Sequence, residues 1–185
     1  SALGLNESVH LKDIKLPEGV AITSLAHGGD NLAVAAISMI KVVEEAPVER
    51  LFAFHRDTRN APKVTPGTRF LSIDGDFPLD DGDVFTIKFV QYPIPMTLTW
   101  SFVVEAVVHN RAVVDVALKS PFPYWRHEHR FESLGPNSTR LIDRVTFLPP
   151  FGPLGRVGHA LVGRRLMARM FDERHRRTKA LMEAR

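Results

Sequence analysis

The spacing of hydrophobic positions changes along the chain, and these changes predict its elements. Residues 32–43 form an apolar and partly β-branched run, which predicts a strand in spite of its alanines. Pro47 then stands where helices commonly start. Four residues follow it at helical spacing, namely Val48, Leu51, Phe52 and His55. We therefore predict two short helical pieces, which end near Pro62 and Gly67.

The middle of the chain is predicted to be all strand. Along residues 97–108, bulky side chains such as Trp100 and Phe102 alternate with smaller or polar ones such as Thr99. Turn residues separate such runs at regular intervals, which is typical of an antiparallel meander. The predicted strands cover residues 70–73, 84–91, 97–108, 111–118, 124–132 and 138–148, with weaker signals at residues 8–12 and 20–24.

The end of the chain changes to a helical pattern. Prolines and glycines between Pro149 and Gly155 end the last strand, and a helix is predicted from about Arg156 to Glu183. At about 1.5 Å per residue it would be roughly 40 Å long, so it must lie across a sheet. Its apolar side comprises Val157, Leu161, Ala168, Phe171, Thr178 and Met182, with Met167 and Met170 beside them. The order of elements predicts an α+β fold in which a curved antiparallel sheet wraps around this helix.

The segment from Trp125 to Phe131, WRHEHRF, carries the candidate chemistry. Side chains alternate between the two faces of a strand, so His127 and His129 share one face with the two aromatic residues. If the charged face meets water, both imidazoles point inward.

The next predicted strand brings a carboxylate to the same face. If Phe131 pairs with Leu141, then His129 lies opposite Asp143; a register two residues away would place His127 there instead. Either register gathers His127, His129 and Asp143 on the inner face. The other face then reads Arg126, Glu128, Arg130, Glu132, Arg140 and Arg144, and we expect cross-strand ion pairs on it.

From about residue 33 onward, the chain resembles the START-like superfamily, also called SRPBCC or helix-grip proteins. The resemblance is carried by residues 46–57, by Pro121-Phe122 with residues 125–131, by residues 139–145, and by residues 149–155 before the terminal helix. It implies a helix-grip domain over residues 33–185, with an apolar cavity between sheet and helix. Polyketide cyclase-like and lipid-transfer proteins belong to this superfamily.

The front of the chain resembles a different family. Within residues 7–37, and mainly over residues 10–20 and 25–30, the chain is similar to the C-terminal part of the bacterial large-subunit ribosomal protein of the CTC, or general-stress, family. The segment contains no RNA-binding residue of that family. We therefore treat residues 1–32 as a small β-rich extension.

Isolated charges on an apolar inner face cost several kcal/mol, so these groups should be satisfied by each other or by a ligand. Three interpretations follow. The groups form a hydrogen-bonded structural cluster, or they fix the polar end of an apolar ligand or act on it as acid and base, or they bind a metal. The metal set would be His127, His129 and Asp143. Alternate residues on one strand are a loose ligand pattern, so we expect no bound metal and no cofactor.

The function expected from these features is binding, as a carrier or sensor, of a small apolar ligand such as a lipid or polyketide. An enzyme of the cyclase or dehydratase type, using His127, His129 and Asp143, is the alternative. The expected ligand-binding residues besides these three are Phe52, Phe89, Leu98, Trp100, Phe102, Trp125, Phe131, Phe147, Met167, Met170 and Phe171.

Composition adds limits to this interpretation. Hydrophobic residues at 44% and charged residues at 24% fit a folded globular chain, and the lack of cysteine excludes disulfides and thiolate chemistry. No apolar run reaches the roughly 18 residues of a membrane span, and the first residues lack the pattern of a signal peptide. We expect a soluble, cytoplasmic protein that is not integral to a membrane. The sequence leaves its oligomeric state open.

Charge is unevenly distributed. From Arg156 onward there are nine Lys or Arg against three Asp or Glu, although the whole chain carries only +3. A second alternative function is therefore binding of nucleic acid or a membrane surface through Arg164, Arg165, Arg169, Arg174, Arg176, Arg177 and Lys179. The rest of the chain has no matching positive stripe, so we expect a solvated helix face and no nucleic acid, and leave peripheral membrane contact open.

Three further candidates receive ordinary roles. His55 is expected to be a surface or capping residue, and His159 to border the cavity mouth. The acidic segment 74–83 lacks the ordered ligand positions of a calcium loop, so we expect a solvated hairpin loop.

Overall fold

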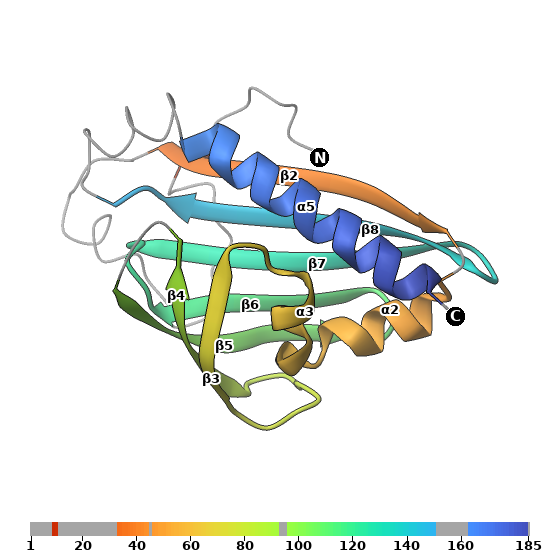
Figure 1. Ribbon diagram of the computed structural model, residues 1–185, viewed down its shortest axis with the longest axis horizontal. Helices are drawn as coiled ribbons and strands as arrows, with labels where there is room; N and C mark the ends of the chain where they lie inside the picture. Colours follow the sequence, from red (N-terminus) through yellow and green to blue (C-terminus); the bar gives the residue numbers. More distant parts are fainter. Residues whose placement is uncertain (1–8, 11–32, 45, 93–95, 151–162, 185) are drawn as a thin grey trace.

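The computed structural model describes residues 9–10, 33–44, 46–92, 96–150 and 163–184. Their strands form one eight-stranded sheet in the order β1-β2-β8-β7-β6-β5-β4-β3, with every neighbouring pair antiparallel (Figure 1). The strands are β1 (Val9–His10), β2 (Ala33–Glu44), β3 (Thr68–Asp74), β4 (Val84–Gln91), β5 (Thr97–Val108), β6 (Ala112–Lys119), β7 (Tyr124–Gly135) and β8 (Ser138–Leu148).

The helices all lie on one side of this sheet. They are α2 (Val48–His55), the short 3₁₀ helix η2 (Thr58–Asn60), α3 (Ala61–Val64) and α5 (Arg164–Glu183). Figure 1 shows α5 running diagonally across β2, β8 and β7, with α2 and α3 beside its C-terminal half. The sheet curls around α5, which confirms the predicted α+β architecture with two short helices after a strand.

Local chemistry explains where α2 begins and ends. Pro47 has φ −55°, and its carbonyl accepts the amide of Leu51 at 3.2 Å, which closes the first turn. The Arg56 amide closes the last turn on the Phe52 carbonyl at 3.0 Å. Val48, Leu51, Phe52 and His55 form the buried side of α2.

The described core consists of two groups of buried side chains. The first joins α2, the middle of the sheet and the end of α5 through Leu51, Phe52, Phe131, Leu141 and Met182. The second joins the sheet to the start of α5, and its buried members are Leu79, Phe85, Phe102, Val104, Trp125, Val145, Phe147 and Phe171. Between these two apolar groups lie the inward-facing polar side chains of β7 and β8.

The strand predictions for residues 84–91, 97–108 and 138–148 are confirmed with these bounds. The strand predicted over residues 32–43 is β2, and only Val9–His10 of the predicted strand 8–12 is described. The predicted strand 20–24 and the predicted helix start near residue 156 lie outside the described residues. Whether residues 1–32 and 33–185 are separate units stays a prediction.

Candidate functional site

The inner face of β7 carries both histidines, as the alternation predicted. Phe131 pairs with Leu141, so His129 lies opposite Asp143 and His127 opposite Val145, which confirms the first of the two predicted registers. His127 is 6% exposed, His129 5% and Asp143 1%. The side chains of His127, His129 and Asp143 are therefore buried among the aromatic residues of the inner face.

Asp143 is the centre of this polar cluster. His129 donates from Nδ1 to Asp143 Oδ1, and His175 donates from Nε2 to Asp143 Oδ2 at 2.5 Å. His127 Nε2 also lies 3.3 Å from Oδ1, without forming a hydrogen bond to it. Within the described part of the chain, this buried nitrogen has no hydrogen-bond partner.

The protonation states follow from burial and from these neighbours. Burial opposes ionisation of Asp143, but the imidazoles of His129, His127 and His175 around its oxygens hold its pKa well below the usual value. Burial, together with the adjacent His127, lowers the pKa of His129 well below 6.5. We infer an ionised Asp143 carboxylate that accepts a hydrogen bond from a neutral His129.

His175 belongs to this cluster, although it was not among the residues predicted from the sequence. It is 1% exposed and lies on α5, four residues after Phe171 and three before Thr178, which are both buried. That helical spacing was the signal that could have identified it. Through Asp143, it connects α5 to β8.

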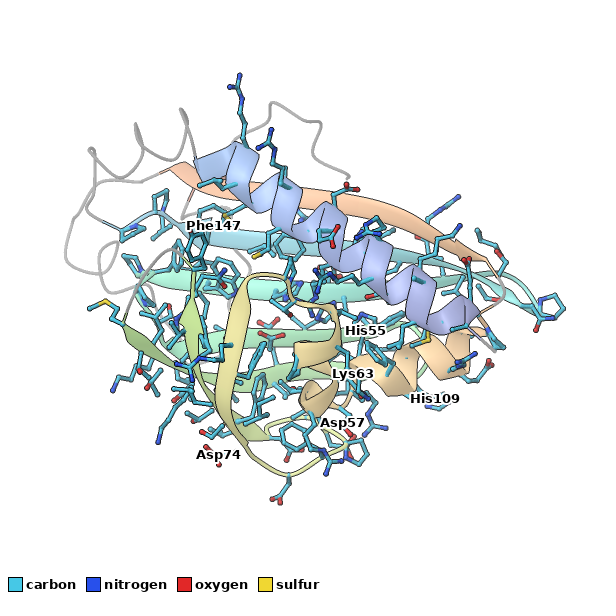
Figure 2. All side chains as sticks on the ribbon, in the orientation of Figure 1. His55, Asp57, Lys63, Asp74, His109 and Phe147 are labelled. Carbon is cyan, nitrogen blue, oxygen red and sulfur yellow. The ribbon has the colours of Figure 1, made fainter. Side chains whose placement is uncertain are left out.

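The prediction that His55 is a surface or capping residue is wrong. It is 9% exposed, and its ring centroid lies 4.9 Å from that of His129. Its Nδ1 donates to the Leu51 carbonyl at 2.8 Å, which leaves Nε2 without a proton in the neutral ring. Burial lowers its pKa to about 4 against the attraction of Asp143. Figure 2 shows His55 in the interior near α5, whereas the exposed His109 lies at the edge of the molecule.

Asp115 on β6 is a second buried carboxylate, and it was not predicted from the sequence. It lies directly opposite His127 in the β6–β7 register and is 8% exposed. Burial raises its pKa to about 6, while His127 and Arg174 act in the other direction. One ligand atom each from Asp115, His127 and His129 lies within 4.8 Å of the others. The histidines of β7 thus stand between two carboxylates, one on each neighbouring strand.

Arg174 of α5 is a cation whose charge reaches this cluster. Its charge acts on both His55 and Asp115, and its Nε is buried without a hydrogen-bond partner among the described residues. It forms no ion pair within 4.0 Å with either carboxylate in the described part of the chain. We expected Arg174 to lie on a solvated helix face, but its Nε is buried.

Most of the predicted ligand-binding residues form one aromatic wall. Trp100, Trp125, Phe102 and Phe147 belong to it, with Met167, Met170 and Phe171 on α5. The ring centroids of Trp100 and Trp125 are 5.2 Å apart, and Phe89 packs on Trp100. The structure does not bring Phe52 and Phe131 into this wall; they pack together in the other core group, while Leu98 is half-buried on β5.

The apolar cavity between the sheet and α5 stays a prediction, because residues 151–162, which precede α5, lie outside the described residues. A pocket of about 670 Å³ is present elsewhere, at the turn between β5 and β6. Its lining includes Val48, Asn110, Glu128, Arg130 and Phe131. It therefore combines charged residues of the outer face with the start of α2 and does not match the predicted ligand site.

The outer face of β7 and β8 has the expected ion pairs. Arg126 contacts Glu105 at 2.6 Å and Glu128 at 3.4 Å, and Glu128 also pairs with Arg130 at 2.8 Å. Across the strands, Arg140 pairs with Glu132 at 2.9 Å. These charged side chains of the outer face are therefore paired with one another, whereas the buried imidazole nitrogen without a partner among the described residues lies on the inner face.

The other candidates have mainly structural contacts. On α5, Arg176 and Arg177 both pair with Glu173 at 2.7 Å, and Lys179 lies 3.4 Å from Glu183. In the acidic segment, Asp80 pairs with Arg56 at 2.5 Å. His159 lies outside the described residues.

Among the described residues, none of the helices has both the length and the hydrophobicity that a membrane span requires.

The structure is similar to solved proteins over about four fifths of its length. A protein from Thermus thermophilus superposes with a TM-score of 0.63 at 14% identity, covering 80% of this chain and 97% of that one. The Zhui aromatase/cyclase from Streptomyces superposes with a TM-score of 0.62 at 13% identity, covering 81% and 94%. This chain has the helix-grip fold. Identities this low establish the helix-grip fold and nothing about activity.

A di-domain aromatase/cyclase of the steffimycin biosynthetic pathway, StfQ, also has this helix-grip arrangement. It superposes with a TM-score of 0.63 at 14% identity, covering 81% of this chain and 51% of the larger protein. No protein-family model matches the sequence.

Curated relatives match only a short segment of this chain. Large ribosomal subunit protein bL25 of Cupriavidus necator is 58% identical over 38 residues, which are 20% of this chain and 18% of that protein. The protein of the same name from Pseudomonas syringae is 45% identical over 49 residues, 26% of this chain and 24% of that protein. The chain therefore spans about a fifth of the length of these relatives, and the predicted ribosomal resemblance is confirmed as a short match.

Proposed function

We propose that the protein is a START-like, or SRPBCC, domain that binds a small, largely apolar ligand with one polar end. The observation that carries this proposal is the position of the cluster around Asp143, which is buried within an aromatic wall. An apolar site with a few convergent polar groups suits a ligand of this shape. Two methionines of α5, Met167 and Met170, would let the wall adapt to different ligands.

Two unpartnered polar atoms support a polar ligand group at this wall. His127 Nε2 and Trp100 Nε1 are both buried, and neither has a hydrogen-bond partner among the described residues. Buried polar groups are paired in most proteins, and leaving one unpaired costs about 1–3 kcal/mol. A ligand that hydrogen-bonds to either atom would remove that cost.

Native mass spectrometry of freshly purified protein tests the proposal directly, since a co-purified small molecule would appear as a mass increment. Uptake of a fluorescent fatty acid gives a second readout, and quenching of the two tryptophans, Trp100 and Trp125, reports on binding at the wall. Because the expected contacts are apolar, uptake should not fall with added salt.

Variants locate the binding site. Trp125→Ala removes a side chain of the wall that is 8% exposed, and we expect weaker uptake of the fatty acid. Leu118→Ala is the matched control, because Leu118 is 61% exposed and lies outside the wall. Equal uptake by both variants, in protein that remains folded, would contradict the proposal.

An enzyme of the cyclase or dehydratase type is the second candidate. The specific observation in its favour is that Asp143 orients His129 through Nδ1, which leaves Nε2 free to accept a proton. The similar fold of two aromatase/cyclases agrees with this candidate. Turnover of a poly-β-ketone substrate that is lost in His129→Ala, with ligand uptake retained, would favour the enzyme over the carrier.

A further inference from the structure

We propose that Asp115, His127 and His129 bind a divalent first-row transition metal, such as Zn²⁺, on the inner face of the sheet. The metal set considered from the sequence used Asp143 as its carboxylate. In the structure both oxygens of Asp143 already accept hydrogen bonds, from His129 and His175. The carboxylate on the other side of the histidines is Asp115. Among the described residues, only burial and more distant charges act on it, with no hydrogen bond, so it is the available ligand.

Sheet geometry places the three side chains together. Asp115 lies opposite His127 in the antiparallel pairing of β6 and β7, and side chains of such pairs start about 5 Å apart. His129 follows two residues later on the same face of β7. The three ligand atoms lie within 4.8 Å of one another, so modest side-chain rotations would bring all three to one ion.

The tautomer of His129 suits this role. Histidines that bind a metal commonly donate their other ring N–H to a carboxylate, which fixes the orientation of the ring. His129 donates from Nδ1 to Asp143, so the lone pair of its Nε2 is free for a metal. Asp143, itself held by His175 from α5, would act as the orienting carboxylate and not as a ligand.

The second ligand, His127, supplies an independent indication. It is 6% exposed, and its Nε2 is buried without a hydrogen-bond partner in the described part of the chain. Asp115 likewise lies in the interior, at 8% exposure, without an ion pair among the described residues. A divalent cation would compensate the buried carboxylate and pair with the imidazole at once.

The donor set indicates the class of metal. Two imidazoles and one carboxylate suit zinc and iron sites, in which three protein ligands leave room for water or a bound molecule. The thiolate ligands that would favour copper(I) are absent, because the chain has no cysteine.

Arg174 opposes cation binding, and this gives the proposal a directional test. Its charge acts on Asp115 from α5, although the two side chains do not form an ion pair. If Asp115 is a metal ligand, Arg174→Gln should strengthen metal binding. If Asp115 is not a metal ligand, Arg174→Gln should not strengthen metal binding, and that result would contradict the proposal.

The experiment is titration of chelator-treated protein with Zn²⁺ by calorimetry and with Co²⁺ by its visible absorption. We expect one equivalent of either ion in the full chain. Asp115→Asn and His127→Ala should each weaken binding by more than about 100-fold, and Asp143→Asn by about 10–100-fold as an orienting group. His109→Ala and Asp80→Asn, which change exposed residues outside the cluster, are the matched controls and should bind normally.

X-ray absorption of the zinc-loaded natural protein keeps the test valid if a variant fails to fold. It should show imidazole scattering from two histidines together with oxygen ligands. Absence of zinc uptake, or binding that survives both Asp115→Asn and His127→Ala, overturns the proposal.

The inference does not depend on the apolar ligand. Fatty-acid uptake is measured with chelator present, and metal binding without fatty acid. Loss of one property therefore leaves the other testable.

Discussion

At the residue scale, Asp143 links the sheet to the terminal helix, because its two oxygens accept from His129 on β7 and His175 on α5. A neutral amide at this position keeps the shape of the side chain but offers one acceptor instead of two. One buried imidazole N–H would then lose its partner, which costs about 1–3 kcal/mol.

We therefore expect Asp143→Asn to lower the free energy of unfolding by about 2 kcal/mol. Urea denaturation followed by far-UV circular dichroism measures this change. Asp80→Asn is the matched control: the Asp80 side chain is 74% exposed, and the ion pair that it forms with Arg56 should contribute less than about 1 kcal/mol. Equal losses in the two variants would show that Asp143 is not a structural link.

His55 gives a prediction on pH. Its folded pKa is about 4 against 6.5 in the unfolded chain, because burial outweighs the attraction of Asp143 and the hydrogen bond to the Leu51 carbonyl. The unfolded chain therefore takes up a proton at this residue between pH 6.5 and 4, whereas the folded chain does not. The stability from a neutral His55 is complete above pH 6.5 and is lost as the pH falls toward 4.

This shift corresponds to a loss of about 3 kcal/mol over that range. In chelator-treated protein, His55→Leu should reduce the acid dependence of the unfolding free energy by about this amount. His109→Leu, which changes an exposed histidine, should leave the dependence as it is. An unchanged slope in His55→Leu would place the protonation elsewhere in the cluster.

The polar cluster was only partly predictable, because the sequence pattern shows the inward direction of some of its residues and not of others. On β7, charged residues alternate with aromatic ones, so the inward direction of His127 and His129 followed from the sequence. On β6, Val113 is 1% exposed and Val114 4%, so both faces of the strand are apolar and the inward direction of Asp115 could not be read. His55 and His175 did lie at helical spacing with buried residues, and the expected surface role of His55 neglected that signal.

At the scale of elements, a row of fully buried side chains along α5 faces the sheet. Phe171, His175, Thr178 and Met182 are all buried, at spacings of four, three and four residues. The ring centroids of Phe171 and His127 are 5.5 Å apart. Phe171 also belongs to the aromatic wall. The row therefore carries both the packing of α5 and its contact with the polar cluster.

Truncating this row should be costly. We expect Phe171→Ala to reduce the unfolding free energy by about 3–5 kcal/mol, since it removes a buried aromatic ring and leaves a cavity. Leu166→Ala, on the same helix but 58% exposed, should change it by less than about 0.5 kcal/mol. Thermal and urea unfolding of both variants would check the comparison, and a small loss for Phe171→Ala would mean that α5 is not held by this row.

Elements were more predictable than their contacts. The pairing of β7 with β8 followed from a short turn and an alternating pattern, because a slip by one residue would expose every inner side chain. The pairing of β2 with β8 joins strands far apart in the sequence, and only the family resemblance implied the sheet that contains it. Local patterns specify single strands, whereas the order of distant strands depends on how the whole core closes.

At the scale of the whole molecule, residues 33–185 contain nearly all of the described sheet pairing. The β1–β2 ladder has two residue pairs, Val9 with Val34 and His10 with Ala33, whereas the β2–β8 ladder has ten. The similar solved structures also cover about four fifths of this chain. The division into an extension over residues 1–32 and a helix-grip domain over residues 33–185 stays a prediction.

Deletion of residues 1–32 tests that prediction. Losing two residue pairs at a sheet edge should cost about 1 kcal/mol, so the melting temperature should fall by only about 2–4 °C and unfolding should stay cooperative. The deletion leaves β2 at the edge of the sheet, where unpaired backbone groups favour association, so it should also lower solubility. Val9→Pro in the full chain is the matched variant, because proline removes a backbone donor without removing the segment. A deletion that abolishes cooperative unfolding while Val9→Pro remains stable would mean that residues 1–32 support the domain through contacts other than the β1 ladder.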